Sequence, residues 1–143
     1  MKIILIRHGE AASSWEKSAD PGLSDLGKAQ AEECSNKLLK LKDINSFRLV
    51  SSPLSRAKET SKPLSKKINI PVSINPLFAE IPSPGINLSE RKEWLQKIFK
   101  MKLSDLEAPQ KKWKNSIIAE LENLDKPTII FSHFMVINII VSY

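Results

Sequence analysis

The chain has 143 residues, which is enough for one domain with a hydrophobic core and too few for two, so we expect a single domain over residues 1–143. A hydrophobic fraction of 41% and a charged fraction of 27% are ordinary for a globular protein and argue against intrinsic disorder. The net charge of +6 suits an anionic substrate, and since no RNA-recognition, zinc-finger or basic-zipper pattern is visible, we do not expect nucleic acid as a partner.

Predicted strands and predicted helices alternate along the chain. Short apolar runs rich in β-branched residues predict buried strands at residues 2–6 and 47–50, and again at 128–131. Ser24 is a plausible N-cap for a helix with one apolar face. A second helix should begin near Pro53, and Pro63 should kink or end it. The apolar face expected for the first helix consists of Leu26, Ala29, Cys34, Leu38 and Leu41, and the second helix should turn Leu54 and Ala57 inward.

The second half begins with residues 69–84, where four prolines predict strand and loop. Helical spacing follows twice, and residues 135–143 look like a buried helix without a capping signal at its end. Either that helix is terminal or a C-terminal piece is missing. Strands that alternate with helices predict an α/β fold with a largely parallel sheet. The two spaced patterns are Trp94, Leu95, Ile98 and Phe99, then Trp113, Ile117, Leu121 and Leu124.

Cysteine content and apolar runs bear on the cellular location. Cys34 is the only cysteine, so no internal disulfide can form, and its helical apolar setting favours a packing role. The apolar run at residues 3–6 is too short for a signal peptide, and no stretch is long enough to span a bilayer. We therefore expect a cytoplasmic protein without membrane contact. The sequence does not indicate an oligomeric state.

Polar residues follow each of the three predicted strands. Arg7 and His8 end the first strand, Ser51 and Ser52 end the second with Arg56 one turn later, and Ser132 and His133 end the third. Ligands of parallel α/β sheets bind outside the carboxyl ends of the strands, so these side chains should gather on one rim. The chain has only two histidines, and both lie at such strand ends.

These residue types suit phosphoryl transfer, which requires positioning and charge neutralisation. Arg7 and Arg56 could bind phosphoryl oxygens bidentately. Their charges would favour a neutral His8, which could attack phosphorus and form a phosphohistidine. His133 would stabilise the transferred group, and Gly9 would let the backbone approach the ligand closely.

The leaving alkoxide needs a proton donor, and a carboxylic acid with a raised pKa is the usual solution. Glu80, after the apolar pair Phe78 and Ala79, is our choice, and Glu10 is the competitor. Structural alternatives stay open for each residue: Glu80 as a surface carboxylate, Arg56 as a solvated helix residue and His133 as a structural histidine. For Ser51 and Ser52, turn and capping roles are favoured over catalysis.

Four blocks, in order, resemble the histidine phosphatase superfamily, the phosphoglycerate mutase-like proteins. They run from residues 5–10 through 20–31 and 51–57 to 131–133, and Thr60 also stands where the family usually has it. The resemblance implies a three-layer α/β/α fold with a mostly parallel sheet, no metal and no other cofactor. It implies a nucleophile at His8 and a phosphate pocket of Arg7, Arg56 and His133, and it aligns Glu80 loosely with the family's proton donor.

Three departures from the family pattern stand out. Phe134 replaces a common glycine and would narrow the pocket, and Trp15 is followed by Glu16 where many members have asparagine. Family domains also generally continue beyond the region of His133, so the end at Tyr143 again suggests that a C-terminal piece is missing.

We expect a phosphomonoester hydrolase that acts through a phosphohistidine at His8, with a phosphorylated small molecule or phosphoprotein as substrate. The short chain leaves little room for the lid segments with which a mutase shields its intermediate. A phosphoglycerate-type mutase and a phosphohistidine-protein phosphatase are the alternatives within the family. A non-catalytic module that binds a phospholigand through Arg7, Arg56 and His133 is the alternative from another class.

Overall fold

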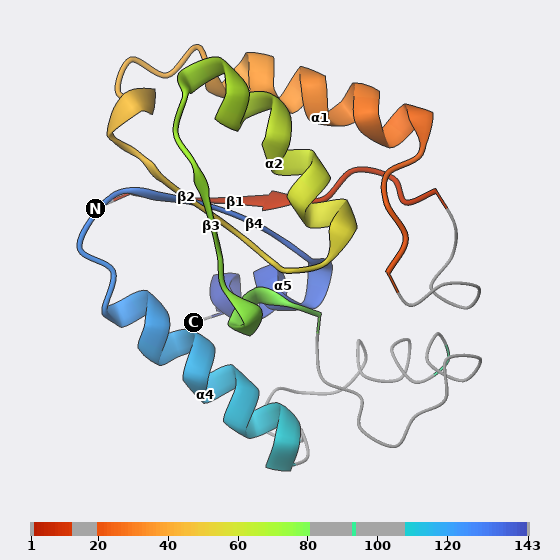
Figure 1. Cartoon of the computed structure of the whole chain (residues 1–143). Helices are drawn as coiled ribbons and strands as arrows, with labels where there is room; N and C mark the ends of the chain where they lie inside the picture. The colour runs from red at the N-terminus through yellow and green to blue at the C-terminus, as the bar shows by residue number, and fades with distance from the viewer. Residues whose placement is uncertain (1, 13–19, 81–92, 94–107, 143) are drawn as a thin grey trace.

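The structure is a computed structural model that describes residues 2–12, 20–80, 93 and 108–142. Within these residues four strands and four helices alternate along the chain (Figure 1). The strands are β1 (Ile3–Arg7), β2 (Arg48–Ser51), β3 (Val72–Ile74) and β4 (Thr128–Ser132). The helices are α1 (Asp25–Leu38), α2 (Ser55–Ile68), α4 (Ala108–Glu122) and α5 (Phe134–Ser142), with short 3-10 turns η1 (Ile44–Ser46) and η2 (Pro76–Phe78).

The sheet has the strand order β1-β4-β2-β3, and every pair in it is parallel. The first and last strands in sequence are therefore neighbours: Ile3 pairs with Thr128 and Arg7 with Ser132. β2 lies on the other side of β4, where Ser51 pairs with Phe131. This register brings the carboxyl ends of β1, β4 and β2 to the same height at one edge of the sheet.

Alternate residues of each strand face opposite layers of helices. Ile130 on β4 and Val50 on β2 pack with Trp113 and Ile117 of α4 and with α5. The intervening residues, such as Ile129, pack on the opposite face with the layer of α1 and α2. Figure 1 shows α1 and α2 over one face and α4 and α5 over the other. The predicted α/β/α arrangement with a parallel sheet is confirmed.

Ser24 caps α1 as expected, and its hydroxyl oxygen accepts from the Gly27 amide at 3.0 Å. The predicted apolar face is partly wrong, because Leu26 and Ala29 are exposed. Small residues make close packing possible on the face that is buried instead. That face consists of Gly27, Ala31, Ser35 and Leu38, with Cys34 half-buried beside it.

The second helix begins at Ser55, two residues after Pro53, and it buries Ala57 as predicted. The Asp20 carboxylate accepts from the Ser55 amide at 2.7 Å and from the Ser55 hydroxyl at 2.9 Å, which satisfies donors at the start of the helix. Pro63 does not end α2, which continues to Ile68. Because proline has no backbone N–H, Pro63 costs the helix one hydrogen bond. The buried Leu64 in the next position anchors the helix beyond it.

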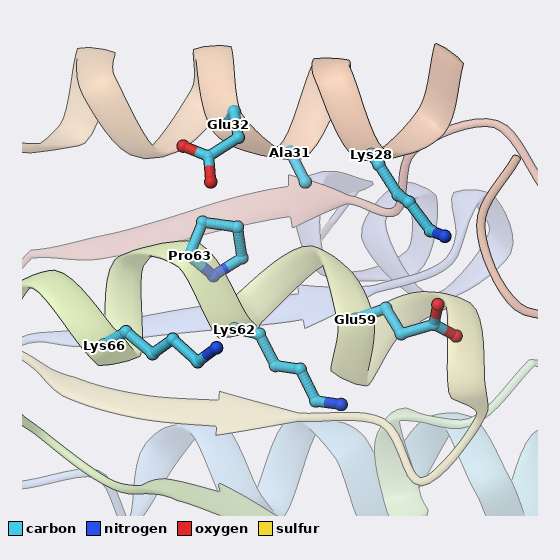
Figure 2. Close-up of a pocket in the computed structure, with 7 residues that line it drawn as sticks. All are labelled: Lys28, Ala31, Glu32, Glu59, Lys62, Pro63 and Lys66. Carbon is cyan, nitrogen blue, oxygen red and sulfur yellow. The ribbon is translucent and has the colours of Figure 1, made fainter. Parts of the chain in front are cut away.

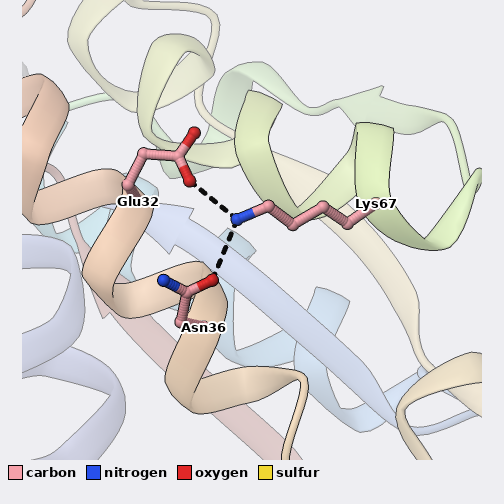
Figure 3. Close-up of polar contacts among 3 residues, drawn as sticks. All are labelled: Glu32, Asn36 and Lys67. Carbon is pink, nitrogen blue, oxygen red and sulfur yellow. Dashed lines mark hydrogen bonds and ion pairs between the residues drawn. The ribbon is translucent and has the colours of Figure 1, made fainter.

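α1 and α2 pack side by side over the sheet. A cavity of about 350 Å³ lies between them, as Figure 2 shows. Further along the helices, Lys67 of α2 donates to the Glu32 carboxylate at 2.7 Å and to the Asn36 side chain at 3.0 Å, both on α1 (Figure 3). These contacts link the C-terminal part of α2 to α1. The residues that line the cavity are Lys28, Ala31, Glu32, Glu59, Lys62, Pro63 and Lys66.

The remaining predictions concern the second half. The helix around Trp113 is confirmed as α4, the final helix as α5, and the proline-containing segment as β3 followed by η2. The helix predicted around Trp94 lies outside the described residues, as do Trp15 and Glu16. No helix in the described ranges is long and apolar enough to cross a membrane.

Candidate active site

The ends of three strands meet at one edge of the sheet. The His8 amide donates to the Ser132 carbonyl at 3.1 Å, and the Ser52 amide donates to the Phe131 carbonyl at 3.0 Å. The residues that follow β1, β4 and β2 are thereby held together by backbone bonds. His8, His133 and Ser52 all lie at this edge, as the strand pattern predicted.

The two ring nitrogens of His8 have different partners. Nδ1 lies 2.7 Å from the carbonyl oxygen of Gly9, and Nε2 lies 3.2 Å from Nε of Arg56. A carbonyl only accepts and a guanidinium only donates, so the proton must be on Nδ1 and the lone pair on Nε2. The structure therefore holds His8 as a neutral imidazole with its lone pair turned toward Arg56.

The environment of His8 lowers its pKa from 6.5 to about 4. Burial is the largest cause, because it disfavours the charged ring, and the positive charges of Arg56 and Arg7 lower the pKa further. The hydrogen bond to Gly9 opposes them. From the sequence we expected a neutral His8 because of like charges alone, whereas desolvation is the main cause.

His133 is fully buried, and its ring centroid lies 5.2 Å from that of His8. Its Nε2 is 2.8 Å from the hydroxyl oxygen of Ser52, and that oxygen accepts from the Leu54 amide at 3.1 Å. Ser52 thus has the turn role that we favoured and also holds the second histidine. The sequence gives little sign of this second role, because β2 and β4 become neighbours only in the folded sheet.

Arg56, in the first turn of α2, is buried next to His8. Thr60 lies one turn further along, and its hydroxyl donates to the Arg56 carbonyl at 2.7 Å and accepts from the Gly9 amide at 3.0 Å. The segment that follows His8 is therefore tied to α2. The residue types alone give no sign of this role of Thr60, and only its place in the family pattern pointed to the residue.

Gly9 and Gly27 allow the segment after β1 to lie against the first turn of α1. A Cβ atom on Gly9 would stand 2.6 Å from the Gly27 carbonyl oxygen, and one on Gly27 would overlap the Glu10 carbonyl oxygen. We expected Gly9 to permit close approach of a ligand. The close approach that the structure shows is between two segments of backbone.

Arg7 lies at the exposed edge of this site, and its guanidinium stands 5.5 Å from the centre of the Phe134 ring. Phe134, the residue in place of the family's common glycine, is thus close to an arginine predicted to bind phosphate. Beside His8 is a cavity of about 230 Å³, smaller than most ligand pockets, which Cys34 also lines. Burial raises the pKa of the Cys34 thiol, in accord with a packing role. The cavity is lined by Arg7, His8, Gly9, Gln30, Ala31, Cys34 and Thr60.

The two candidate proton donors differ in their surroundings. Glu80 is half-buried in the bend after η2, where the hydroxyl of Ser132 donates to the Phe78 carbonyl at 2.7 Å. This bond ties the segment before Glu80 to the residue next to His133. The exposed Glu10 carboxylate instead accepts from the Ser24 hydroxyl at 2.9 Å, so it is engaged at the start of α1. Among the described residues, no group of three or more His, Cys, Asp and Glu side chains could hold a metal ion.

Many solved protein structures resemble this chain. A phosphoserine phosphatase from Entamoeba histolytica, in complex with 3-phosphoglyceric acid, is 24% identical with a TM-score of 0.69, over 97% of this chain and 77% of that one. A mycobacterial glucosyl-3-phosphoglycerate phosphatase is 17% identical with a TM-score of 0.66, over 98% and 77%. The mycobacterial hydrolase 1 is 18% identical with a TM-score of 0.71, over 98% and 76%.

At these identities the solved structures show a shared fold. None of the curated proteins matches the chain in sequence. The family model of the histidine phosphatase superfamily, branch 1, matches residues 3–143, which is nearly the whole chain. The protein therefore belongs to the histidine phosphatase superfamily.

Proposed function

We propose that the protein hydrolyses phosphomonoesters through a phosphohistidine on Nε2 of His8. The observation that carries this proposal is the pair of contacts on the His8 ring: the Gly9 carbonyl binds Nδ1, and the lone pair of Nε2 faces the Arg56 guanidinium. A nucleophile and a phosphate-binding group are thus in contact. Two proteins of similar structure are phosphatases, which favours hydrolysis over a mutase reaction.

In the first step a phosphoryl group binds between Arg7, Arg56 and His133. The Arg56 guanidinium then donates to the phosphoryl oxygens in place of Nε2 of His8. Nε2 attacks phosphorus, the ester P–O bond breaks, and the leaving alkoxide takes a proton from Glu80. The imidazole becomes positively charged as the P–N bond forms. The Nδ1 hydrogen bond to Gly9 then stabilises that charge, as it does for a protonated ring.

In the second step water attacks the phosphohistidine. The Glu80 carboxylate accepts a proton from the water, the P–N bond breaks, and His8 is released as the neutral imidazole. Buried His133, 5.2 Å from His8 and held by Ser52, stabilises the transferred group in both steps. The roles of Glu80 and His133, a metal-free reaction and a cytoplasmic location stay predictions.

The test is to trap the intermediate. We expect the protein, mixed with a radiolabelled aryl phosphate and quenched in base, to carry label that is stable to alkali, lost in acid and located on His8. A His8→Ala variant should incorporate none, while a Cys34→Ser variant, altered in the same cavity, should be labelled like the wild type. If inorganic phosphate binds but no label is ever incorporated, the non-catalytic binding module is correct instead.

A further inference from the structure

One row of lysines on α2 has no explanation in the stability of the helix. Lys58, Lys62 and Lys66 recur every four residues, so they lie on one face, and all three are exposed. In the part of the chain that the structure describes, the ion pairs involve other cations, such as Lys67 with Glu32. Like charges at this spacing destabilise a helix by about 0.2–0.5 kcal/mol per pair.

The helix dipole does not account for this row either. Lys66 in the last turn interacts favourably with the dipole, but Lys58 in the first turn is at the unfavourable end. The first turn itself has no acidic residue, and the Asp20 carboxylate at the start of the helix accepts from the Ser55 amide and hydroxyl, not from Lys58. An anionic partner outside the helix would remove the repulsion among these side chains.

The lysine row borders a groove between α2 and β3 of about 410 Å³, here named the α2–β3 groove. Its apolar side is formed by Val72 and Ile74, and Ile74 is 47% exposed. No acidic side chain lines it. The full lining is Lys58, Ser61, Lys62, Ser65, Lys66, Val72 and Ile74.

The cavity on the other side of α2 provides a comparison. Figure 2 shows Lys62 and Lys66 again, now with Lys28, but Glu32 and Glu59 face the same space. These two carboxylates offset part of the positive charge there, although Glu32 also pairs with Lys67. The uncompensated charge is therefore greatest on the β3 side.

The α2–β3 groove leads toward the candidate active site. Arg56, which contacts His8, stands at the beginning of α2, and Lys66 is ten residues later, about 15 Å along the helix. The Asn75 amide, directly after β3, donates to the Ser51 carbonyl at 3.0 Å, so this end of the groove lies beside the segment that holds His133. An extended peptide covers that distance with about five residues.

We propose that the α2–β3 groove binds an acidic segment of a phosphorylated protein substrate, whose carboxylates face the lysine row and whose apolar side chains contact Val72 and Ile74. This rests on the activity proposed for His8. An extended chain presents alternate side chains to opposite sides, which suits a groove with one charged and one apolar wall. Single-stranded nucleic acid would fit less well, because no aromatic ring for base stacking lines the groove.

The binding test compares two charge reversals. Lys62→Glu with Lys66→Glu alters the groove, and Lys111→Glu with Lys112→Glu makes the same change in net charge on exposed positions of α4, across the sheet. The probe is a fluorescein-labelled, unphosphorylated peptide that alternates glutamate and leucine, followed by anisotropy. We expect the groove variant to bind about tenfold more weakly and the control variant to change no more than about twofold.

Equal losses in both variants would overturn the proposal, because they would show a general charge effect. Tighter binding of a single-stranded oligonucleotide that also depends on Lys62 and Lys66 would overturn it too. Matching circular dichroism spectra and melting temperatures show that both variants are folded.

A second measurement separates the groove from the chemistry. For a phosphopeptide that carries the acidic segment, kcat/KM should fall about tenfold in the groove variant, through KM, while kcat/KM for a small aryl phosphate changes less than about twofold. Equal losses on both substrates would contradict a docking role. If the wild type hydrolyses neither the phosphopeptide nor the aryl phosphate, the activity proposed for His8 is wrong. The anisotropy measurement with the unphosphorylated peptide still tests whether the α2–β3 groove binds an acidic segment.

Discussion

At the scale of single residues, the state of His8 follows from two contacts and from its burial. The Gly9 carbonyl fixes the tautomer, Arg56 faces the lone pair, and burial keeps the ring uncharged. Two arginines beside a histidine would favour the same state by charge, but the larger effect comes from removing the ring from water. Burial depends on the fold, so the sequence predicts that the pKa of His8 is lowered but not the main cause of that shift.

The lowered pKa of His8 predicts how stability depends on pH. The unfolded chain binds a proton at His8 near pH 6.5 and the folded chain near pH 4, so between these values the unfolded state holds more protons and stability falls as the pH falls. The loss should reach at most about 3 kcal/mol, at about 1.4 kcal/mol per pKa unit. Urea unfolding of the wild type and of a His8→Asn variant, from pH 8 to pH 4, measures it as the difference between the two profiles.

Parallel pH profiles for the two proteins would contradict the lowered pKa. The ring resonances offer an independent check, because His8 and His133 are the only histidines. In an Arg56→Gln variant the pKa of His8 should rise, since one positive charge that lowers it is gone.

At the scale of elements, the site depends on how closely α1 approaches the end of β1. Gly27 is a poor choice for helix propensity, and alanine there would ordinarily stabilise the helix by about 1 kcal/mol. The Glu10 carbonyl leaves no room for a Cβ, however, and backbone cannot move aside as a flexible side chain can. Packing therefore outweighs propensity at this position.

A Gly27→Ala substitution should destabilise the protein by about 1–3 kcal/mol, because the extra methyl group overpacks the contact with Glu10. Gly22→Ala is the control, since the atoms nearest to a Cβ there belong to the end of the Glu59 side chain, which can shift at the cost of its long hydrogen bond from the Leu23 amide (3.4 Å). Urea unfolding should give the larger loss for Gly27→Ala. An equal loss in both variants, or a gain for Gly27→Ala, would show that the contact with Glu10 relaxes easily.

At the scale of the whole molecule, the protein has a net charge of +6, and positively charged side chains also lie at the candidate active site. Arg56 and Lys58 stand at the positive end of the α2 dipole, and Arg7 lies at the rim of the site. These charges attract a phosphate dianion from solution, and salt screens them over a Debye length of about 8 Å at 0.15 M and about 3 Å at 1 M.

We therefore expect kcat/KM for a small aryl phosphate to fall about fivefold between low salt and 1 M salt, chiefly through KM. Initial rates in sodium chloride and then in choline chloride measure it, since agreement between the two excludes an effect of one cation. A value of kcat/KM that does not change with ionic strength would mean that substrate capture depends on short contacts alone.

Periodicity and residue type in the sequence determined the α/β class, the strand ends and the polar residues that follow them, because period-2 and period-3.6 patterns are local. The order of family blocks likewise determined the family. Only the tertiary structure decided the strand order, the contact of Ser52 with His133, the contact of Thr60 with Gly9 and the buried face of α1. Each of these joins residues that are distant in sequence or depends on which neighbour covers a helix, and hydrophobic periodicity carries no information about which segments become neighbours.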